Sequence, residues 1–238
     1  MRRSWLVLAV VLSGCPIVVP GPAHDANALC AQLIAANDLP SAETACDHAL
    51  EYQPRYWDAL HNKGLIAQMR GQRDVAKKFY IEALRTNQAM KQSHNAIGAL
   101  AMDEGDLDYA IDHFRAALRL DPQYIEARRN LGAALLRKKD YVEAEKAFRQ
   151  FILVNGDISE AWIGFGVALN AQGKRDDAAN AFEKATILDV GDDRAWLLRG
   201  LNELERSRIE EAKECFERCL LANEKNLECQ QRLESTRR

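Results

Sequence analysis

The pattern of small and apolar positions along the chain repeats every 34 residues. One column is glycine in all but its first member: Cys30, Gly64, Gly98, Gly132, Gly166 and Gly200. A second column is always alanine: Ala42, Ala76, Ala110, Ala144, Ala178 and Ala212. A third column is mostly aromatic: Cys46, Tyr80, Phe114, Phe148, Phe182 and Phe216. Self-similarity at this period predicts a repeat architecture in which each copy is one pair of helices. The copies span 23–56, 57–90, 91–124, 125–158, 159–192 and 193–226, without insertion.

These columns place small residues where two helices must approach each other closely. Glycine and alanine leave room for the helix backbones to cross, and the aromatic ring fills the remaining gap. Each helix pair leaves an apolar face that the next pair covers, so the array grows by stacking. Composition also favours helix, because glycine (13) and proline (6) are scarce. Residues 227–238 are polar and predict a helix that caps the last open face.

The columns resemble the tetratricopeptide repeat (TPR), which has small residues at repeat positions 8, 20 and 27 and an aromatic residue at 24. Bulky residues at position 4 (Trp162, Trp196) and the Asp121-Pro122 pair at a repeat end fit the same pattern. The resemblance covers 204 of the 238 residues. It implies an all-α fold, a right-handed superhelical solenoid of six TPR helical hairpins plus a C-terminal capping helix. The terminal copies deviate, as capping repeats do, and the fourth has Phe151 at position 27.

The N-terminal segment reads as a targeting signal. A basic start, a short apolar run from Trp5 to Leu12 and small residues predict a secretory signal over residues 1–14. The run is too short to cross a bilayer. The tetrapeptide Leu12-Ser13-Gly14-Cys15 resembles a bacterial lipobox, in which the signal is cut before the cysteine and the cysteine carries palmitate-type acyl chains. The alternatives are an ordinary cleaved signal and a core strand.

The lipobox resemblance implies that residues 1–14 are removed and that Cys15 is the lipidation site. Residues 15–22 would then be the lipidated N-terminus and a short Pro-rich tether. Pro16 follows the cysteine where inner-membrane retention usually shows Asp, so the resemblance favours the outer membrane. Several acyl chains make such anchoring effectively permanent. We therefore expect a lipid-anchored protein whose body faces the periplasm.

Two of the remaining cysteines fall in the first copy. An exported body lies in an oxidising compartment, where disulfides persist. Cys30 and Cys46 occupy positions 8 and 24, which face each other across one hairpin in the TPR family. The resemblance therefore favours a Cys30–Cys46 disulfide, with two buried thiols as the alternative.

The other three cysteines lie near the C-terminus. Cys229 begins the expected capping helix, and antiparallel pairing about the preceding turn places it nearer Cys219 than Cys215. We favour Cys219–Cys229, with Cys215–Cys229 and free thiols as alternatives. We expect one cysteine to stay unpaired.

The sequence offers no catalytic constellation. The five histidines are scattered and form no HExxH or similar ligand spacing. Gly164-Phe165-Gly166 lies inside an expected helix, which excludes a phosphate-binding loop. No serine occupies a nucleophile elbow. A formal net charge of −3 argues against nucleic acid as a partner. We predict a protein that is not an enzyme and that needs no cofactor, metal or small-molecule substrate.

The TPR resemblance implies a concave groove lined by the first helix of every repeat. The candidate partner-binding residues are His61, Leu65, Met69, Asn95, Met102, Arg129, Leu136, Arg137, Ile163 and Asn170. Exposed methionine and leucine at such a surface suit an extended or helical peptide. Leu197, Leu201 and Leu204 either continue this groove or pack beneath the capping helix.

A lipobox, a short tether and six uninterrupted repeats together resemble the pilotins of type IV pilus systems, the Tgl/PilF-type lipoproteins. That resemblance implies an outer-membrane lipoprotein that binds secretin subunits and promotes secretin multimerisation for pili and pilus-dependent motility. The alternative is a general periplasmic TPR scaffold that recruits cell-wall enzymes or outer-membrane assembly factors. A third possibility, a repeat domain that delivers an active site in trans, is disfavoured by the missing catalytic residues.

Overall fold

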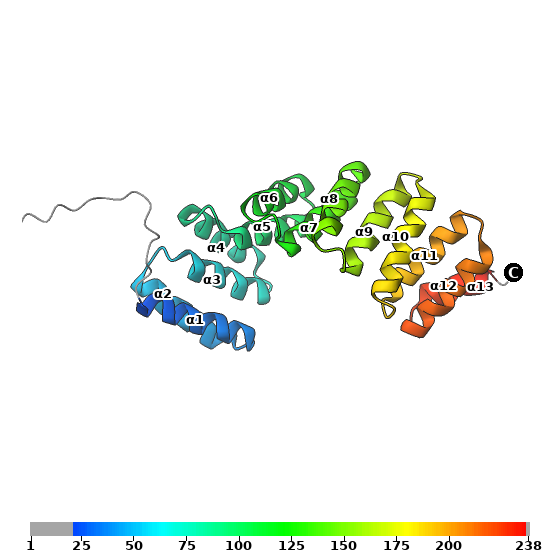
Figure 1. The fold of residues 1–238 in the computed structure, drawn as a ribbon. Coiled ribbons are helices and arrows are strands. Elements are labelled where there is room, and N and C mark those ends of the chain that lie inside the picture. The colour runs from blue at the N-terminus through cyan, green and yellow to red at the C-terminus, as the bar shows by residue number, and fades with distance from the viewer. Residues whose placement is uncertain (1–20, 237–238) are drawn as a thin grey trace, which may run out of the picture. The chain divides into compact units, whose positions relative to one another are not determined.

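The structure, a computed structural model, describes residues 21–236 and is all-helical over that range (Figure 1). The helices are α1 (Gly21–Ala35), α2 (Leu39–Tyr52), α3 (Trp57–Met69), α4 (Arg73–Thr86), α5 (Lys91–Glu104), α6 (Leu107–Leu120), α7 (Ile125–Arg137), α8 (Tyr141–Val154), α9 (Ser159–Ala171), α10 (Arg175–Leu188), α11 (Asp193–Glu205), α12 (Ile209–Ala222) and α13 (Leu227–Thr236). Residues 21–236 thus form six helical hairpins and one further helix, which confirms the predicted fold class. The right-handed superhelix of the whole array stays a prediction.

The chain divides into two compact units. Unit 1 ends at Thr86 and contains the hairpins α1–α2 and α3–α4. Unit 2 begins at Asn87 and contains the other four hairpins and α13. Within each unit, the first helix of a hairpin packs against both helices of the preceding one, for example α9 against α7 and α8. Each unit therefore has its own stacked core.

The first helix begins earlier than the sequence predicts. The predicted tether ends at residue 22, whereas Gly21 and Pro22 already belong to α1. Proline is tolerated in the first turn of a helix, where its missing N–H has no intrahelical partner to lose. The signal segment, Cys15 and the rest of the tether lie outside the described residues, as do the last two residues of the predicted capping helix.

The turn inside each hairpin contains one residue with left-handed backbone. These residues follow one another at 34-residue intervals: Asn37, Gly71, Gly105, Lys139, Gly173 and Ser207. The next residue often caps the second helix, as where the carboxylate of Asp106 accepts a hydrogen bond from the backbone N–H of Tyr109. Such a side chain satisfies one of the free amides at the helix start. The turn and the cap together end one helix and begin the next.

The glycine and aromatic columns meet inside every hairpin from the second to the sixth. A methyl group built on Gly98 would lie 2.7 Å from a ring carbon of Phe114, and one on Gly166 would lie 2.6 Å from Phe182. Both rings are buried. In the fourth hairpin Phe148 also presses on Gly164 of the next hairpin, so two glycines accommodate one ring. The Gly164-Phe165-Gly166 sequence therefore has a packing explanation.

The first hairpin replaces this contact with a disulfide. Cys30 and Cys46 are bonded, with their Cα atoms 5.3 Å apart, and both are fully buried. At the other end a second disulfide, Cys219–Cys229, joins α12 to α13 across a Cα–Cα distance of 6.3 Å. Cys215 is a buried free thiol whose pKa burial raises to about 11. It is therefore protonated and unreactive at neutral pH.

Adding one methyl group tests the glycine–ring contact. We expect Gly98→Ala to lower the free energy of unfolding by about 1–3 kcal/mol, because the buried Phe114 ring must leave its position. Urea unfolding followed by circular dichroism measures this change. Gly21→Ala is the matched control, since Gly21 is helical and a methyl there meets no atom within 4 Å. Equal stability of the Gly98→Ala and unsubstituted proteins would show that the Phe114 ring does not restrict the side chain at position 98.

Candidate protein-binding groove

The ten predicted groove residues lie on four first helices. In unit 1, α3 carries His61, Leu65 and Met69. In unit 2, α5, α7 and α9 carry the other residues: Asn95, Met102, Arg129, Leu136, Arg137, Ile163 and Asn170. Each unit therefore presents its own part of the predicted surface.

The unit 1 part combines a neutral imidazole with an exposed thioether. The ring centroids of His61 and Tyr80 are 5.2 Å apart, and the Tyr80 hydroxyl donates a hydrogen bond of 2.8 Å to Gln68. Burial lowers the pKa of His61 to about 4 and raises the pKa of Tyr80. His61 is therefore uncharged at neutral pH. Met69, at the end of α3, is 49% exposed and is open to a partner.

Asparagine pairs tie the first helices of neighbouring hairpins together. Asn62 donates to Asn27 at 2.9 Å in unit 1, and Asn130 donates to Asn95 at 3.0 Å in unit 2. A third such bond runs from Asn202 to Asn170, also at 2.9 Å. Each bond pairs an amide donor with an amide oxygen across the helix interface, as buried polar groups generally require. The predicted groove residues Asn95 and Asn170 therefore hold successive hairpins in register.

The remaining unit 2 candidates differ in how much they offer a partner. Arg137 is exposed, and the half-exposed Arg129 lies 3.8 Å from the carboxylate of Glu160. Met102 and Leu136 are partly buried and pack against a core cluster that includes Phe114. The two arginines are thus the accessible polar groups, while the two apolar side chains serve mainly as core.

Ile163 is a correction to the predicted groove. Its side chain is only 2% exposed and packs with Ala185 and Ala195, against Leu198. Ile163 and Leu198 occupy repeat positions 5 and 6 of successive hairpins, the positions that hold the Asn27–Asn62 and Asn95–Asn130 pairs. An apolar pair fills this interface in the last two hairpins, so Ile163 cannot contact a partner.

The leucines of the last hairpin pack beneath the capping helix, the second of the two roles that the sequence left open. Leu197, Leu201 and Leu204 pack against a cluster of Ala212, Phe216 and Leu233, and Leu233 belongs to α13. They support the capping helix, so they do not extend the groove.

Clefts between second helices are the feature that the sequence reasoning missed. In the described part of unit 2, three such clefts lie between the second helices of successive hairpins. Their volumes are about 360 Å³ between α6 and α8, 440 Å³ between α8 and α10, and 330 Å³ between α10 and α12. The TPR resemblance predicted a binding surface on the first helices only. For the α8–α10 cleft, a signal was available at repeat position 29, where the first three repeats have charged residues (Glu51, Arg85, Arg119) and the fourth has Leu153, which lines this cleft.

Side chains that could bind a metal ion do not gather in groups among the described residues. Among residues 21–236, no three or more His, Cys, Asp or Glu side chains gather where they could hold a metal ion. His94 and His113 form a pair whose Nδ1 atoms are 3.1 Å apart. In the same described range, no helix is both long and apolar enough to cross a membrane.

Comparison with known families identifies the repeat. A family model described as tetratricopeptide repeat matches residues 62–125 and 163–225, more than half of the chain. A second model with the same description matches residues 101–162. A search of curated proteins finds no match.

Solved structures share the fold at low sequence identity. PilF of Pseudomonas aeruginosa is 17% identical, with a TM-score of 0.77 over 90% of this chain and 97% of that protein. MamA is 26% identical, with a TM-score of 0.64 over 69% of this chain and 96% of that one. YrrB, described as a TPR protein with an unusual peptide-binding site, is 20% identical, with a TM-score of 0.67 over 79% and 96%.

The buried imidazole of His61 should make stability depend on pH. Its folded pKa lies below the ordinary value of 6.5, so between pH 6.5 and 4 the unfolded chain binds more protons than the folded one. Stability therefore falls as pH falls through this window. We expect unfolding in urea to be easier at pH 5 than at pH 7.5, with about 1–2 kcal/mol of the difference due to His61.

His61→Gln removes the titrating group and should shrink that pH difference, whatever its effect at pH 7.5. His48→Gln is the control, because His48 is exposed on α2 and should leave the difference unchanged. A pH difference that is the same in His61→Gln and in the unsubstituted protein would contradict the assignment.

Proposed function

The chain belongs to the tetratricopeptide repeat family, and from this premise we propose that it is an outer-membrane pilotin of the Tgl/PilF type, with Tgl as the member it resembles in plan. In this proposal the protein binds subunits of the type IV pilus secretin and promotes their assembly into the pore, which supports pilus-dependent motility. A role as a scaffold for protein–protein interaction follows from membership of the TPR family itself.

One observation carries the proposal: the fold similarity to PilF extends over nearly the whole of both chains. The match covers 90% of this chain and 97% of that protein, with a TM-score of 0.77. Similarity at 17% identity concerns the fold, so the function is carried over as a proposal. The Leu12-Ser13-Gly14-Cys15 tetrapeptide adds independent support, because a pilotin acts at the membrane where its client assembles.

The proposed mechanism is physical. A lipid on Cys15 would hold the repeats near the periplasmic surface of the outer membrane. Each unit would bind the unassembled subunit through its own exposed first-helix side chains: Met69 in unit 1, and Arg129 and Arg137 in unit 2. Confinement to the target membrane raises the effective concentration of the captured subunit there, as any tether does. No bond is made or broken, so no catalytic group is needed.

A second candidate is a general periplasmic scaffold that recruits cell-wall enzymes or outer-membrane assembly factors. MamA is more similar to this chain in sequence than PilF is, at 26% against 17% identity. The repeat fold alone therefore does not select one partner. Crosslinking in cells separates the two candidates: secretin subunits support the pilotin, and murein synthases or hydrolases support the scaffold.

Secretin assembly is the direct test. We expect a deletion strain to lose most secretin oligomers that resist heat and detergent, seen as a shift to monomer on immunoblots. A Met69→Lys protein should restore assembly poorly, because a charge would occupy the apolar contact surface. Val75→Lys is the matched control on α4 of the same unit, at 40% against 49% exposure. Normal oligomers in the deletion strain would exclude the pilotin function.

The lipid anchor gives a separate prediction. Cys15→Ala should abolish acylation, so the protein should move from the outer-membrane fraction to a soluble or uncleaved form and lose labelling by palmitate analogues. Cys215→Ala is the control, because that thiol is buried in unit 2. Unchanged outer-membrane fractionation of Cys15→Ala would contradict the proposed anchor without touching the proposed partner.

A further inference from the structure

The clefts on either side of α8 lie on a surface that the predicted groove does not use. In the α8–α10 cleft, α9 contributes Trp162, Phe165 and Leu169, whereas its remaining predicted groove residue is Asn170. At 3.6 residues per turn, Asn170 points about 110° away from the mean direction of the three cleft residues around the helix axis. A partner in the clefts would therefore leave the groove of unit 2 free.

Both clefts around α8 have apolar floors. Leu131 and Leu135 line the α6–α8 cleft, and the α9 residues take the equivalent places in the α8–α10 cleft. The Trp162 indole donates a 2.9 Å hydrogen bond to the Gly156 carbonyl, which fixes the ring. Leu153 stands at the rim of the α8–α10 cleft and is 80% exposed. An apolar side chain so open to water beside an apolar cleft is typical of an interaction site.

The charges around these two clefts are unevenly distributed. In the α6–α8 cleft the cations Arg115, Arg119 and Lys146 face a single carboxylate, Glu143, so two positive charges are in excess. The chain as a whole carries a net charge of −3. Its acidic character is thus reversed at this surface, which favours an acidic partner.

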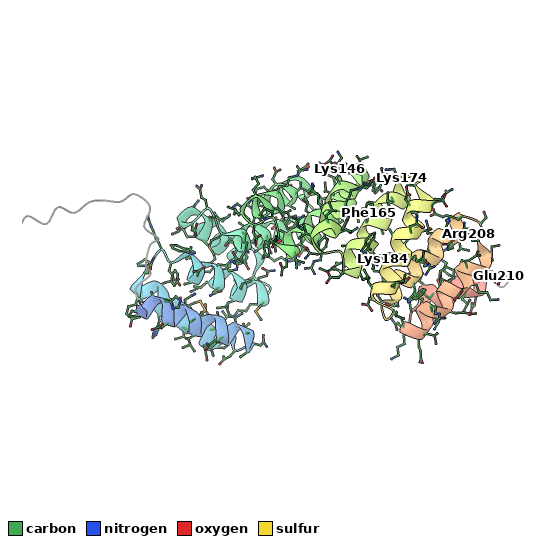
Figure 2. The ribbon with its side chains drawn as sticks, in the orientation of Figure 1. Lys146, Phe165, Lys174, Lys184, Arg208 and Glu210 are labelled. Atoms are coloured by element: carbon green, nitrogen blue, oxygen red, sulfur yellow. A yellow bond between two sulfur atoms is a disulfide. The ribbon has the colours of Figure 1, made fainter. Side chains whose placement is uncertain are left out.

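The α8–α10 cleft has equal numbers of each charge, but it exposes both cations and only one of its two carboxylates, Asp177. Glu145 binds both Arg149 and Lys174 at 2.7 Å, is only 12% exposed, and has its pKa lowered chiefly by the hydrogen bond from Lys174. Arg149 also lies over the Phe165 ring, 5.6 Å from its centroid. Asp177 is the second carboxylate in the lining. Figure 2 shows Lys146 and Lys174 along one edge of unit 2, with Phe165 below them.

The third cleft, between α10 and α12, provides an internal comparison. Arg199 and Glu203 stand there at the repeat positions of Phe165 and Leu169, so its floor is charged. Its four arginines are balanced by four glutamates. Of these three clefts, only the two beside α8 combine an apolar floor with accessible cations.

We propose that the two clefts beside α8 form one docking surface for an acidic amphipathic segment of a partner protein. Apolar side chains of that segment enter the clefts, and its carboxylates meet Arg115, Arg119 and Lys146 on one side and Arg149 and Lys174 on the other. This site is independent of the first-helix groove and of the secretin proposal.

Fluorescence anisotropy on the full chain tests the site with two labelled peptides. Both are amphipathic helices with leucines at i, i+3, i+4 and i+7, one with glutamates on its polar face and the other with lysines. We expect the glutamate peptide to bind at least about tenfold tighter than the lysine peptide, and its affinity to fall as salt rises. Leu153→Ser and Arg115→Glu should each weaken binding about fivefold or more.

Two variants serve as controls for these effects. Ile187→Ser changes the same repeat position one hairpin later, at 63% exposure and outside both clefts, and should bind like the unsubstituted protein. Met69→Lys alters the proposed groove and should also leave this affinity unchanged. Circular dichroism melting confirms that each variant is folded.

Several results would overturn the proposal. Equal weakening by Leu153→Ser and Ile187→Ser, or equal affinity for the two peptides, would show that binding is not specific to the clefts. A dimer in sedimentation that Leu153→Ser abolishes would assign the surface to a second copy of the chain. Binding to anionic phospholipid vesicles that depends on Leu153 would assign it to lipid.

Discussion

The close approach of two helices at a glycine determines the architecture of this protein. A methyl group at Gly98 or Gly166 would come within 2.7 Å of a buried ring carbon, so the helix pair has no freedom to accept even the smallest side chain there. The ring in turn fills the gap that the missing side chain leaves, and interiors packed at this density tolerate little change in volume. Because the contact recurs every 34 residues, the second to sixth hairpins are all built on the same glycine–ring contact.

The ends of the chain show what happens when a hairpin has fewer neighbours. In the first hairpin Cys30 and Cys46 stand at the positions of the glycine and the ring, and a covalent bond replaces the packing contact. At the other end, Cys219–Cys229 holds α13 over the last hairpin, where Leu197, Leu201 and Leu204 also support it. Both disulfides thus lie in the outermost described elements of the array, where each crosslink joins two packed helices covalently.

Periodicity alone predicted the hairpins, because the small, alanine and aromatic columns each state a packing requirement. It could not predict which way an individual side chain turns at the interface. Ile163 has the repeat position of a groove residue, yet it is buried, because the last two hairpins meet there through an apolar pair instead of an amide pair. The left-handed turns at Lys139 and Ser207 have no glycine to signal them, so the sequence marks them only through their 34-residue register with Gly71, Gly105 and Gly173. The clefts beside α8 depend on spacing between second helices, which the small, alanine and aromatic columns do not record.

The two surfaces of unit 2 then differ in what they can contribute to binding. On the groove side, Asn95 and Asn170 are engaged in bonds between hairpins, so a ligand there competes with groups that maintain the stack. On the α8 side, Arg149 and Lys174 are held by a shared and mostly buried Glu145, and the apolar floors are formed by rings and leucines that the core already positions. A site whose groups are fixed before binding loses less entropy when a partner arrives. The side of the repeat that the sequence columns do not mark is therefore the one whose geometry is better prepared to bind.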